Sequence, residues 1–184
     1  MAAKEPSVGA AADDGDDGGL ASQLCLANDK DAIARAVLQH ALTTMGRAVL
    51  FVVRGEELTL WQGAGFETRL DPSHFGAIGI RGLALLDHLL GHDHYHGPLG
   101  DSEAHREIYT RLEVPAPVEI LLVPVHVSDR LVALFLGDGG PESRVEGDPR
   151  EGLRLARMLS LALNVIIFKK KIRNLGSFAG HSSS

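Results

Sequence analysis

The chain has 184 residues, of which 45% are hydrophobic and 23% charged, and its formal net charge at pH 7 is −6. These values are typical of one soluble globular domain with tails. The acidic balance argues against a nucleic-acid partner, which would need a basic surface. The single cysteine, Cys25, excludes an internal disulfide framework and a zinc site of the CxxC type.

Both ends of the chain have the composition of disordered segments. The start is rich in glycine, alanine and acidic residues, and the end is rich in glycine and serine. We therefore expect a disordered acidic leader over residues 1–27, a folded domain over 28–173 and a flexible tail over 174–184. The leader lacks the apolar run of a secretory signal, so we expect a cytoplasmic protein. The apolar run 158–168 is too short for a membrane span, which needs about 20 residues.

The first elements are predicted to be a helix and a hairpin. Asn28 or Asp29 can cap a helix over 31–45, and Gly46 ends it. Its apolar residues recur on one broad face, as in an amphipathic helix. The β-branched run 47–54 predicts a buried strand, and the alternating segment 58–62 predicts a second strand paired with it.

The middle of the chain is predicted to be mixed. A helical turn over 71–75 begins with Asp71 as its cap and Pro72 as its first helical residue. A short strand is expected at 78–80, a helix over 81–90, an extended segment over 95–99, and a helix from Asp101 or Ser102 to about 112.

The last part predicts the two strongest strands and the longest helix. Strands over 118–127 and 130–137 are joined by the two-residue turn Ser128-Asp129, and a helix runs from about 149 to 172. Strands that come in hairpins indicate an α+β class. We expect a central antiparallel sheet of about five to six strands, flanked by an N-terminal helix and a long C-terminal helix.

Residues 29–172 resemble a GAF domain, a small sensory fold with a central antiparallel sheet. The resemblance is carried by the opening amphipathic helix, the strand Ala48-Val-Leu-Phe-Val-Val53, and Leu122-Val-Pro-Val-His-Val127 followed by Leu131-Val-Ala-Leu-Phe-Leu-Gly-Asp138. Similar pieces occur in PAS and roadblock/longin-type domains. The motif of the cyclic-nucleotide-binding members is absent, and Cys25 has no counterpart to the chromophore cysteine. The resemblance implies a regulatory module without an assigned cofactor.

The resemblance also implies a place for a ligand, between the sheet and the segment that links its halves. The residues expected near such a pocket are Trp61, Phe75, Ile78, Ile80, Leu86 and Tyr95. The alternative is that these side chains simply fill the core, because the chain contains few aromatic residues.

A histidine cluster is the sharpest local feature. His88, His92, His94, His96 and His105 lie within 18 residues of one another. Neutral imidazole binds zinc, copper or nickel, so His92, His94 and His96 are candidate metal ligands. The alternatives are a solvated connection and a pH-sensitive or ligand-contacting role. No glycine-elbow serine and no phosphate-binding loop is present, so we expect no enzymatic activity.

The final helix is predicted to carry two apolar stripes. One stripe can cover a sheet face, and a second stripe on a soluble domain usually meets a partner. The residues expected at such an interface are Leu153, Ala156, Ser160, Leu163 and Ile167. We therefore expect a homodimer through the first and last helices, in a signalling module that binds a small ligand or a protein. The alternative is an interaction scaffold without a ligand, of the same or a roadblock/longin-like fold.

Overall fold

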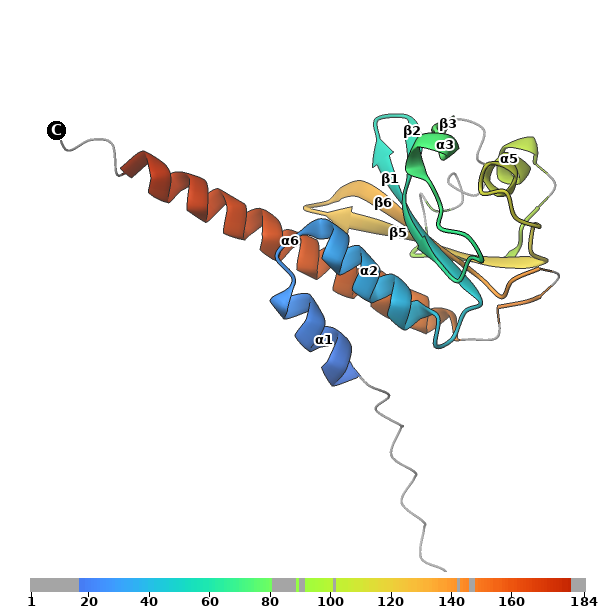
Figure 1. Ribbon diagram of the computed structural model, residues 1–184, viewed down its shortest axis with the longest axis horizontal. Coiled ribbons are helices and arrows are strands. Elements are labelled where there is room, and N and C mark those ends of the chain that lie inside the picture. The colour runs from blue at the N-terminus through green and yellow to red at the C-terminus, as the bar shows by residue number, and fades with distance from the viewer. Residues whose placement is uncertain are drawn as a thin grey trace, which may run out of the picture.

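The computed structural model describes residues 17–80, 89, 92–100, 102–141, 143–145 and 148–179. Its elements follow in the order α1 (Asp17–Leu26), α2 (Lys30–Ala41), β1 (Arg47–Arg54), β2 (Glu57–Ala64), α3 (Pro72–Phe75), β3 (Ala77–Gly79), β4 (Tyr95–Pro98), α5 (Glu103–Arg111), β5 (Glu119–Val127), β6 (Arg130–Asp138) and α6 (Pro149–Ala179). The strands form one six-stranded sheet in the order β3-β2-β1-β6-β5-β4, and every neighbouring pair is antiparallel. The predicted α+β class is confirmed (Figure 1).

The hairpin between β5 and β6 forms as the sequence predicts. Ser128 and Asp129 both have positive φ angles, 49° and 62°. Two consecutive residues of this kind make a turn whose twist matches that of the flanking strands. The turn sets the register, in which Val127 lies opposite Arg130 and Leu122 opposite Leu136.

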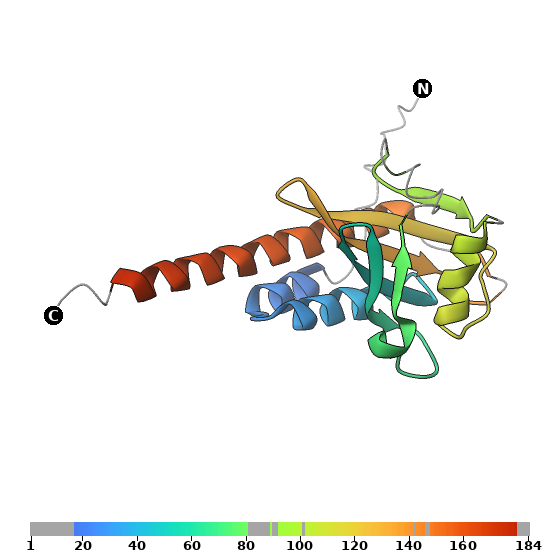
Figure 2. The same cartoon turned by 90° about the horizontal axis from the view of Figure 1, so that it is seen from above.

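The sheet carries a hydrophobic core on each face. Alternate residues of each strand point to opposite faces, so Leu50 and Phe135 join the core under the long helices, while Phe51 and Leu134 join the other core. The first core is covered by α1, α2 and α6, which lie together in Figures 1 and 2. The second core includes Phe75 of α3 and Tyr109 of α5. Two packed faces therefore fix both layers of helices to one sheet.

Helix α2 lies on the first face by virtue of its sequence pattern. The Asp29 carboxylate accepts hydrogen bonds from the amides of Asp31 and Ala32, at 2.9 and 2.8 Å, which satisfies free donors at the helix start. Ile33 and Val37, one turn apart, are fully buried against the sheet. The cap and the apolar face agree with the predicted helix.

Helix α6 approaches the sheet closely because of a glycine. A β-carbon at Gly152 would lie 2.3 Å from Cδ2 of Leu121 on β5. Leu155 and Leu159, on the following turns, have no exposed surface. The first half of α6 is thus packed onto the sheet, while its second half projects away from the domain (Figures 1 and 2).

Two sequence-based boundaries differ from the structure, and one predicted helix lies almost wholly outside the described residues. Asp17–Leu26 is helical, although residues 1–27 are predicted to be a disordered leader; Leu20 and Leu24 are buried against the core, 2% and 9% exposed. Helix α6 extends to Ala179, beyond the expected end at 172 and into the predicted tail. The predicted helix over 81–90 lies outside the described residues, apart from Leu89. Within the part of the chain that the structure describes, no helix is both long and apolar enough to cross a membrane.

Candidate functional site

The six residues predicted to line a pocket do not share one location. Phe75 and Ile78 are buried in the second core, each 2% exposed, and Ile80 and Tyr95 pack against that core. Trp61 lies on the opposite face of the sheet and packs against the first core. Leu86 lies outside the described residues. The sheet therefore separates Trp61 from the other described residues of the predicted set. Phe75 and Ile78 fill the second core, as the alternative interpretation expects.

Trp61 has partners of its own at the edge of α2. Its indole nitrogen donates a hydrogen bond of 2.6 Å to the Asp31 carboxylate, and the Lys30 ammonium lies 5.7 Å from the ring centroid. Leu58 and Leu60 point to the second core, and Trp61 points to the first. The register of the β1–β2 pair shifts at Trp61, which lies between Leu60, opposite Phe51, and Gln62, opposite Leu50.

A buried polar network joins Arg47 and Asp138 to Tyr109 of the second core, and no motif or spacing in the sequence indicates it. Arg47 and Asp138 are 5% and 0% exposed, and Nε of Arg47 donates to Oδ1 of Asp138 at 2.7 Å. The Tyr109 hydroxyl donates to Oδ2 of the same carboxylate at 3.1 Å. The Arg47 guanidinium also donates to the Pro115 carbonyl. Burial, together with the Asp138 charge, raises the pKa of Tyr109, so this phenol remains a donor. Every polar group named has a partner, which indicates a structural role.

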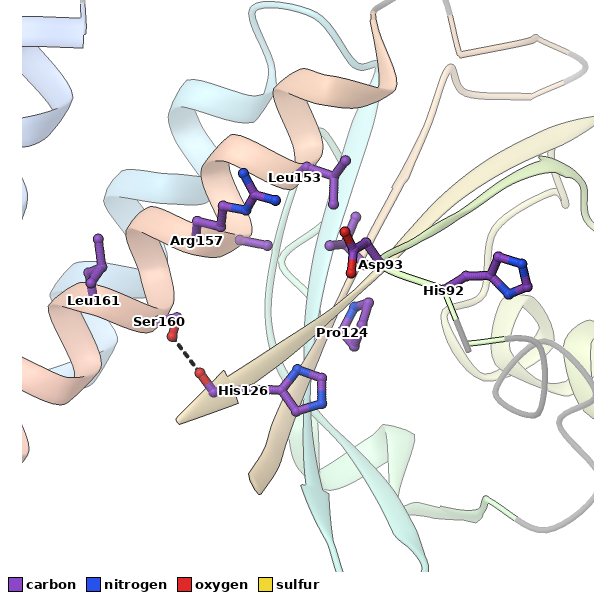
Figure 3. A pocket seen from close by; sticks show the side chains of 10 residues that line it. His92, Asp93, Pro124, His126, Leu153, Arg157, Ser160 and Leu161 are labelled. Carbon is purple, nitrogen blue, oxygen red and sulfur yellow. Dashed lines mark hydrogen bonds between the residues drawn. The ribbon is translucent and has the colours of Figure 1, made fainter. Parts of the chain in front are cut away.

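A pocket opens on the first face, between α6 and β5 (Figure 3). Its volume is about 430 Å³. Apolar side chains of β5 and α6 line it together with polar side chains of both elements and of the segment before β4: His92, Asp93, Val123, Pro124, His126, Leu153, Ala156, Arg157, Ser160 and Leu161. Polar and apolar groups thus meet in one concave site, which is the usual composition of a small-molecule pocket.

The short edge strand explains why the pocket exists. β4 pairs with β5 only from Glu119 to Leu122, so the register given for β4 stops before Val123. Pro124 has no amide hydrogen to donate to a further strand. Near its end, β5 is tied to α6 by the Ser160 hydroxyl, which donates to the His126 carbonyl. Among the described residues, the second half of β5 therefore pairs with β6 alone and borders the pocket.

A second concave surface is apolar and lies between α1 and α6. It has a volume of about 200 Å³ and is lined by Ala21, Leu24, Cys25, Met158, Leu161, Ala162 and Val165. Further along α6, large apolar side chains are exposed: Leu161 by 66%, Val165 by 49%, Phe168 by 59% and Ile172 by 69%. We call these four residues the α6 seam.

The predicted interface stripe on α6 lies mostly against the domain. Ala156 is 3% exposed, Leu153 and Leu163 are partly buried against the first core, and the Ser160 hydroxyl bonds to β5. Ile167 is 40% exposed. Besides Ile167, the large apolar side chains exposed on the described part of α6 are the four of the α6 seam.

The histidines do not assemble into a metal site in the described residues. No group of three or more histidine, cysteine, aspartate or glutamate side chains lies close enough there to hold an ion. His92 borders the pocket, whereas His96 lies on β4, where its Nε2 is 3.8 Å from a Glu119 oxygen. His94 lies between these two positions, and His88 lies outside the described residues. His105 is 3% exposed, and burial lowers its pKa.

Comparisons with known proteins find similar folds but no similar sequence. No family model matches the chain, and no curated protein matches it. Among solved structures, residues 122 to 287 of a methyl-accepting chemotaxis protein align over 82% of this chain and 98% of that chain, with a TM-score of 0.63 and 14% identity.

Two further similar structures are GAF domains. The phycocyanobilin-bound GAF domain of a cyanobacterial phytochrome aligns over 83% of this chain and 96% of its own, with a TM-score of 0.61 and 13% identity. The GAF domain of a two-component sensor histidine kinase from Bacillus halodurans aligns over 80% and 99%, with a TM-score of 0.55 and 15% identity. The sheet and its terminal helices, taken with these alignments, give the chain the fold of GAF domains.

Proposed function

We propose that this protein is a non-catalytic regulatory module of the GAF fold, which acts in the cytoplasm as a homodimer and transmits through its terminal helices. The observation that carries the proposal is the α6 seam, a row of exposed apolar side chains that begins beside α1, at Leu161 and Val165, and continues along the projecting part of α6 to Phe168 and Ile172. The similar structures include domains of a chemotaxis protein and of a sensor histidine kinase, which supports a role in signalling.

The spacing of the seam fits a second helix. Leu161, Val165, Phe168 and Ile172 follow one another at intervals of four, three and four residues. This alternation is the heptad pattern of a coiled coil, which keeps one apolar strip facing a partner helix. Phe168 and Ile172 lie beyond Ile166, the last α6 residue that is buried among those described, and they continue the apolar row that Leu161 and Val165 begin. A second copy of α6 is therefore the occupant that we propose for the seam.

The groove beside α1 extends this surface toward the domain. Met158, Leu161 and Val165 line it from α6, while Leu24 and Cys25 line it from α1. Leu26, at the end of α1, is 78% exposed.

The exposed side of α2 is polar, since it presents Arg35 and Gln39 to solvent. The helices that we expect to meet in the dimer are therefore α1 and α6, and α2 remains in the core.

The second candidate is an interaction scaffold without a ligand. The packing of Phe75 and Ile78 favours it, because these residues fill the face on which the GAF resemblance predicts a pocket. Both candidates keep the dimer, and they differ in whether a small molecule changes it.

The dimer is tested by replacing one residue of the seam. We expect the unaltered protein to sediment with the mass of two chains at micromolar concentration, and Val165→Glu to sediment as one chain, because a charge would be buried in the apolar strip. Asn174→Glu introduces the same charge at an exposed position outside the seam and should leave the dimer intact. A monomeric unaltered protein would exclude this function.

A further inference from the structure

We propose that the pocket between α6 and β5 binds a small zwitterion, a molecule that carries one ammonium group, one carboxylate and an apolar body. An aliphatic α-amino acid is the simplest molecule of this kind. The pocket lies on the face that the long helices cover, on the opposite side of the sheet from Phe75 and Ile78. It thus differs from the site that the GAF resemblance predicts.

Two opposite charges define the polar part of the site. Asp93, in the segment before β4, directs its carboxylate toward α6, and Arg157 presents its guanidinium from α6 (Figure 3). No hydrogen bond or ion pair to another described residue engages either side chain. A carboxylate accepts from an ammonium group, and a guanidinium binds a carboxylate through paired donors. The two groups together match the two ends of a zwitterion.

The rest of the lining is suited to an apolar body. Val123, Leu153, Ala156 and Leu161, which belong to β5 and α6, line the same pocket as the two charges. A volume of about 430 Å³ lies in the lower part of the range usual for small-molecule pockets, roughly 300–1,000 Å³. The volume is therefore sufficient for a molecule of the size of an aliphatic amino acid.

The remaining polar side chains lie at the margin of the pocket. The His92 ring points away from α6, on the other side of the chain from the Asp93 carboxylate, and the His126 ring points away from α6 as well (Figure 3). The Ser160 hydroxyl is engaged with the His126 carbonyl. Asp93 and Arg157 are thus the two charged groups that face the space between α6 and β5.

The location of the site connects it with the dimer. Leu161 borders the pocket on one side and the groove between α1 and α6 on the other, and it is the first residue of the α6 seam. If the terminal helices adopt two arrangements, a ligand that contacts α6 there would change the seam only by binding one arrangement more tightly than the other. This regulatory part rests on the proposed function, whereas binding of the ligand does not.

Calorimetric titration with three related compounds tests the site. L-leucine carries both charges, L-leucinamide lacks the carboxylate, and N-acetyl-L-leucine lacks the ammonium group. We expect saturable binding of L-leucine with a dissociation constant below about 1 mM, and binding at least about tenfold weaker for each analogue, because each leaves one protein charge unmatched.

Two variants assign the ends of the ligand. Arg157→Gln should weaken L-leucine about tenfold and leave L-leucinamide unchanged, since that compound has no carboxylate to lose a partner. Asp93→Asn should weaken L-leucine similarly and leave N-acetyl-L-leucine unchanged. Arg150→Gln and Asp129→Asn alter exposed residues outside the pocket and should change none of the three affinities.

Each other result overturns the site. Absence of saturable L-leucine binding excludes it, and equal affinities for all three compounds would reduce it to an apolar contact. An effect of Arg157→Gln without an effect of Asp93→Asn would make it an anion site. Sedimentation without ligand reports on the dimer separately: a dimer that binds no L-leucine refutes only the ligand, and a monomer that binds it refutes only the dimer.

Discussion

The buried pair of Arg47 and Asp138 allows a quantitative test of the fold. Asp138 has no exposed surface, and its carboxylate accepts hydrogen bonds from Arg47, from Tyr109 and from the amide of Gly140. Arg47→Met keeps an unbranched side chain of similar length but removes the cation. The carboxylate then remains buried with hydrogen bonds and no opposite charge. Removal of one partner from such a pair costs about 3–5 kcal/mol.

The size of this loss relative to total stability makes it measurable. A domain of this kind is stable by about 5–15 kcal/mol, so the variant loses a large part of the free energy of unfolding. With a urea dependence of roughly 2 kcal/mol per molar, the unfolding midpoint should fall by about 2 M. Arg35→Met, an exposed arginine on α2, should change stability by less than about 0.5 kcal/mol.

A second substitution distinguishes a buried charge from lost packing. Arg47→Met combined with Asp138→Asn removes both charges, and the asparagine carbonyl can still accept from Gly140. We expect the double variant to be about 1–2 kcal/mol more stable than Arg47→Met alone, because no uncompensated charge is left in the interior. Urea unfolding followed by tryptophan fluorescence measures all four proteins. A double variant no more stable than Arg47→Met would refute this reasoning.

Two other features predict stability changes that the same assay measures. His105 is buried and its pKa is lowered, so the unfolded chain binds more protons than the folded one; stability should therefore be full above about pH 6.5 and decrease as pH falls from there. An NMR titration in which the His105 imidazole protonates at or above pH 6.5 would contradict this. Gly46→Ala should cost about 3 kcal/mol, because a β-carbon would lie 2.4 Å from the Gly139 carbonyl oxygen, which belongs to the backbone and cannot turn aside. Gly79→Ala, where no atom lies within 4 Å, should be neutral, and equal losses in the two glycine variants would exclude the steric explanation.

The order of elements could be predicted because the signals for it are local. The Ser128-Asp129 turn lies between two alternating apolar runs, and the Asp29 cap begins an amphipathic helix. Helix α1 was missed because its segment was assigned by composition. Leu20 and Leu24, spaced one turn apart, are the signal that indicates a buried helix face there.

The site was harder to predict because it depends on contacts between distant segments. Periodicity on α6 identified apolar stripes, but which stripe meets the sheet depends on the rotation of the helix, and close contact at Gly152 helps to set that rotation. The partners Arg47 and Asp138 are 91 residues apart, so no spacing connects them. Asp93 and Arg157 border one pocket beside the short strand β4, which pairs with only four residues of β5. The sequence predicts an extended segment there but does not show where its pairing with β5 ends.

The position of Trp61 could have been predicted from strand alternation, but the pocket prediction followed the family resemblance instead. Strand alternation separates Trp61 from Leu58 and Leu60, and that separation is what the structure contains. The pocket predicted from the resemblance placed Trp61 with Phe75 and Ile78 instead. Alternation along β2 holds from Leu58 to Trp61, and the shift in register there places Gln62 on the same face as Trp61, where its side chain bonds to the Asp31 carbonyl.

The projecting half of α6 has a mechanical consequence. Ile166, 6% exposed, is anchored against the first core, and the helix continues from there to Ala179, a length of about 20 Å at 1.5 Å per residue. Such a rod behaves as a lever with its fulcrum at the edge of the domain. A tilt of about 5° at that fulcrum moves the far end sideways by just under 2 Å, because displacement grows with the length of the arm. A small adjustment between α6 and β5 would thus be amplified before it reaches anything attached to the helix end.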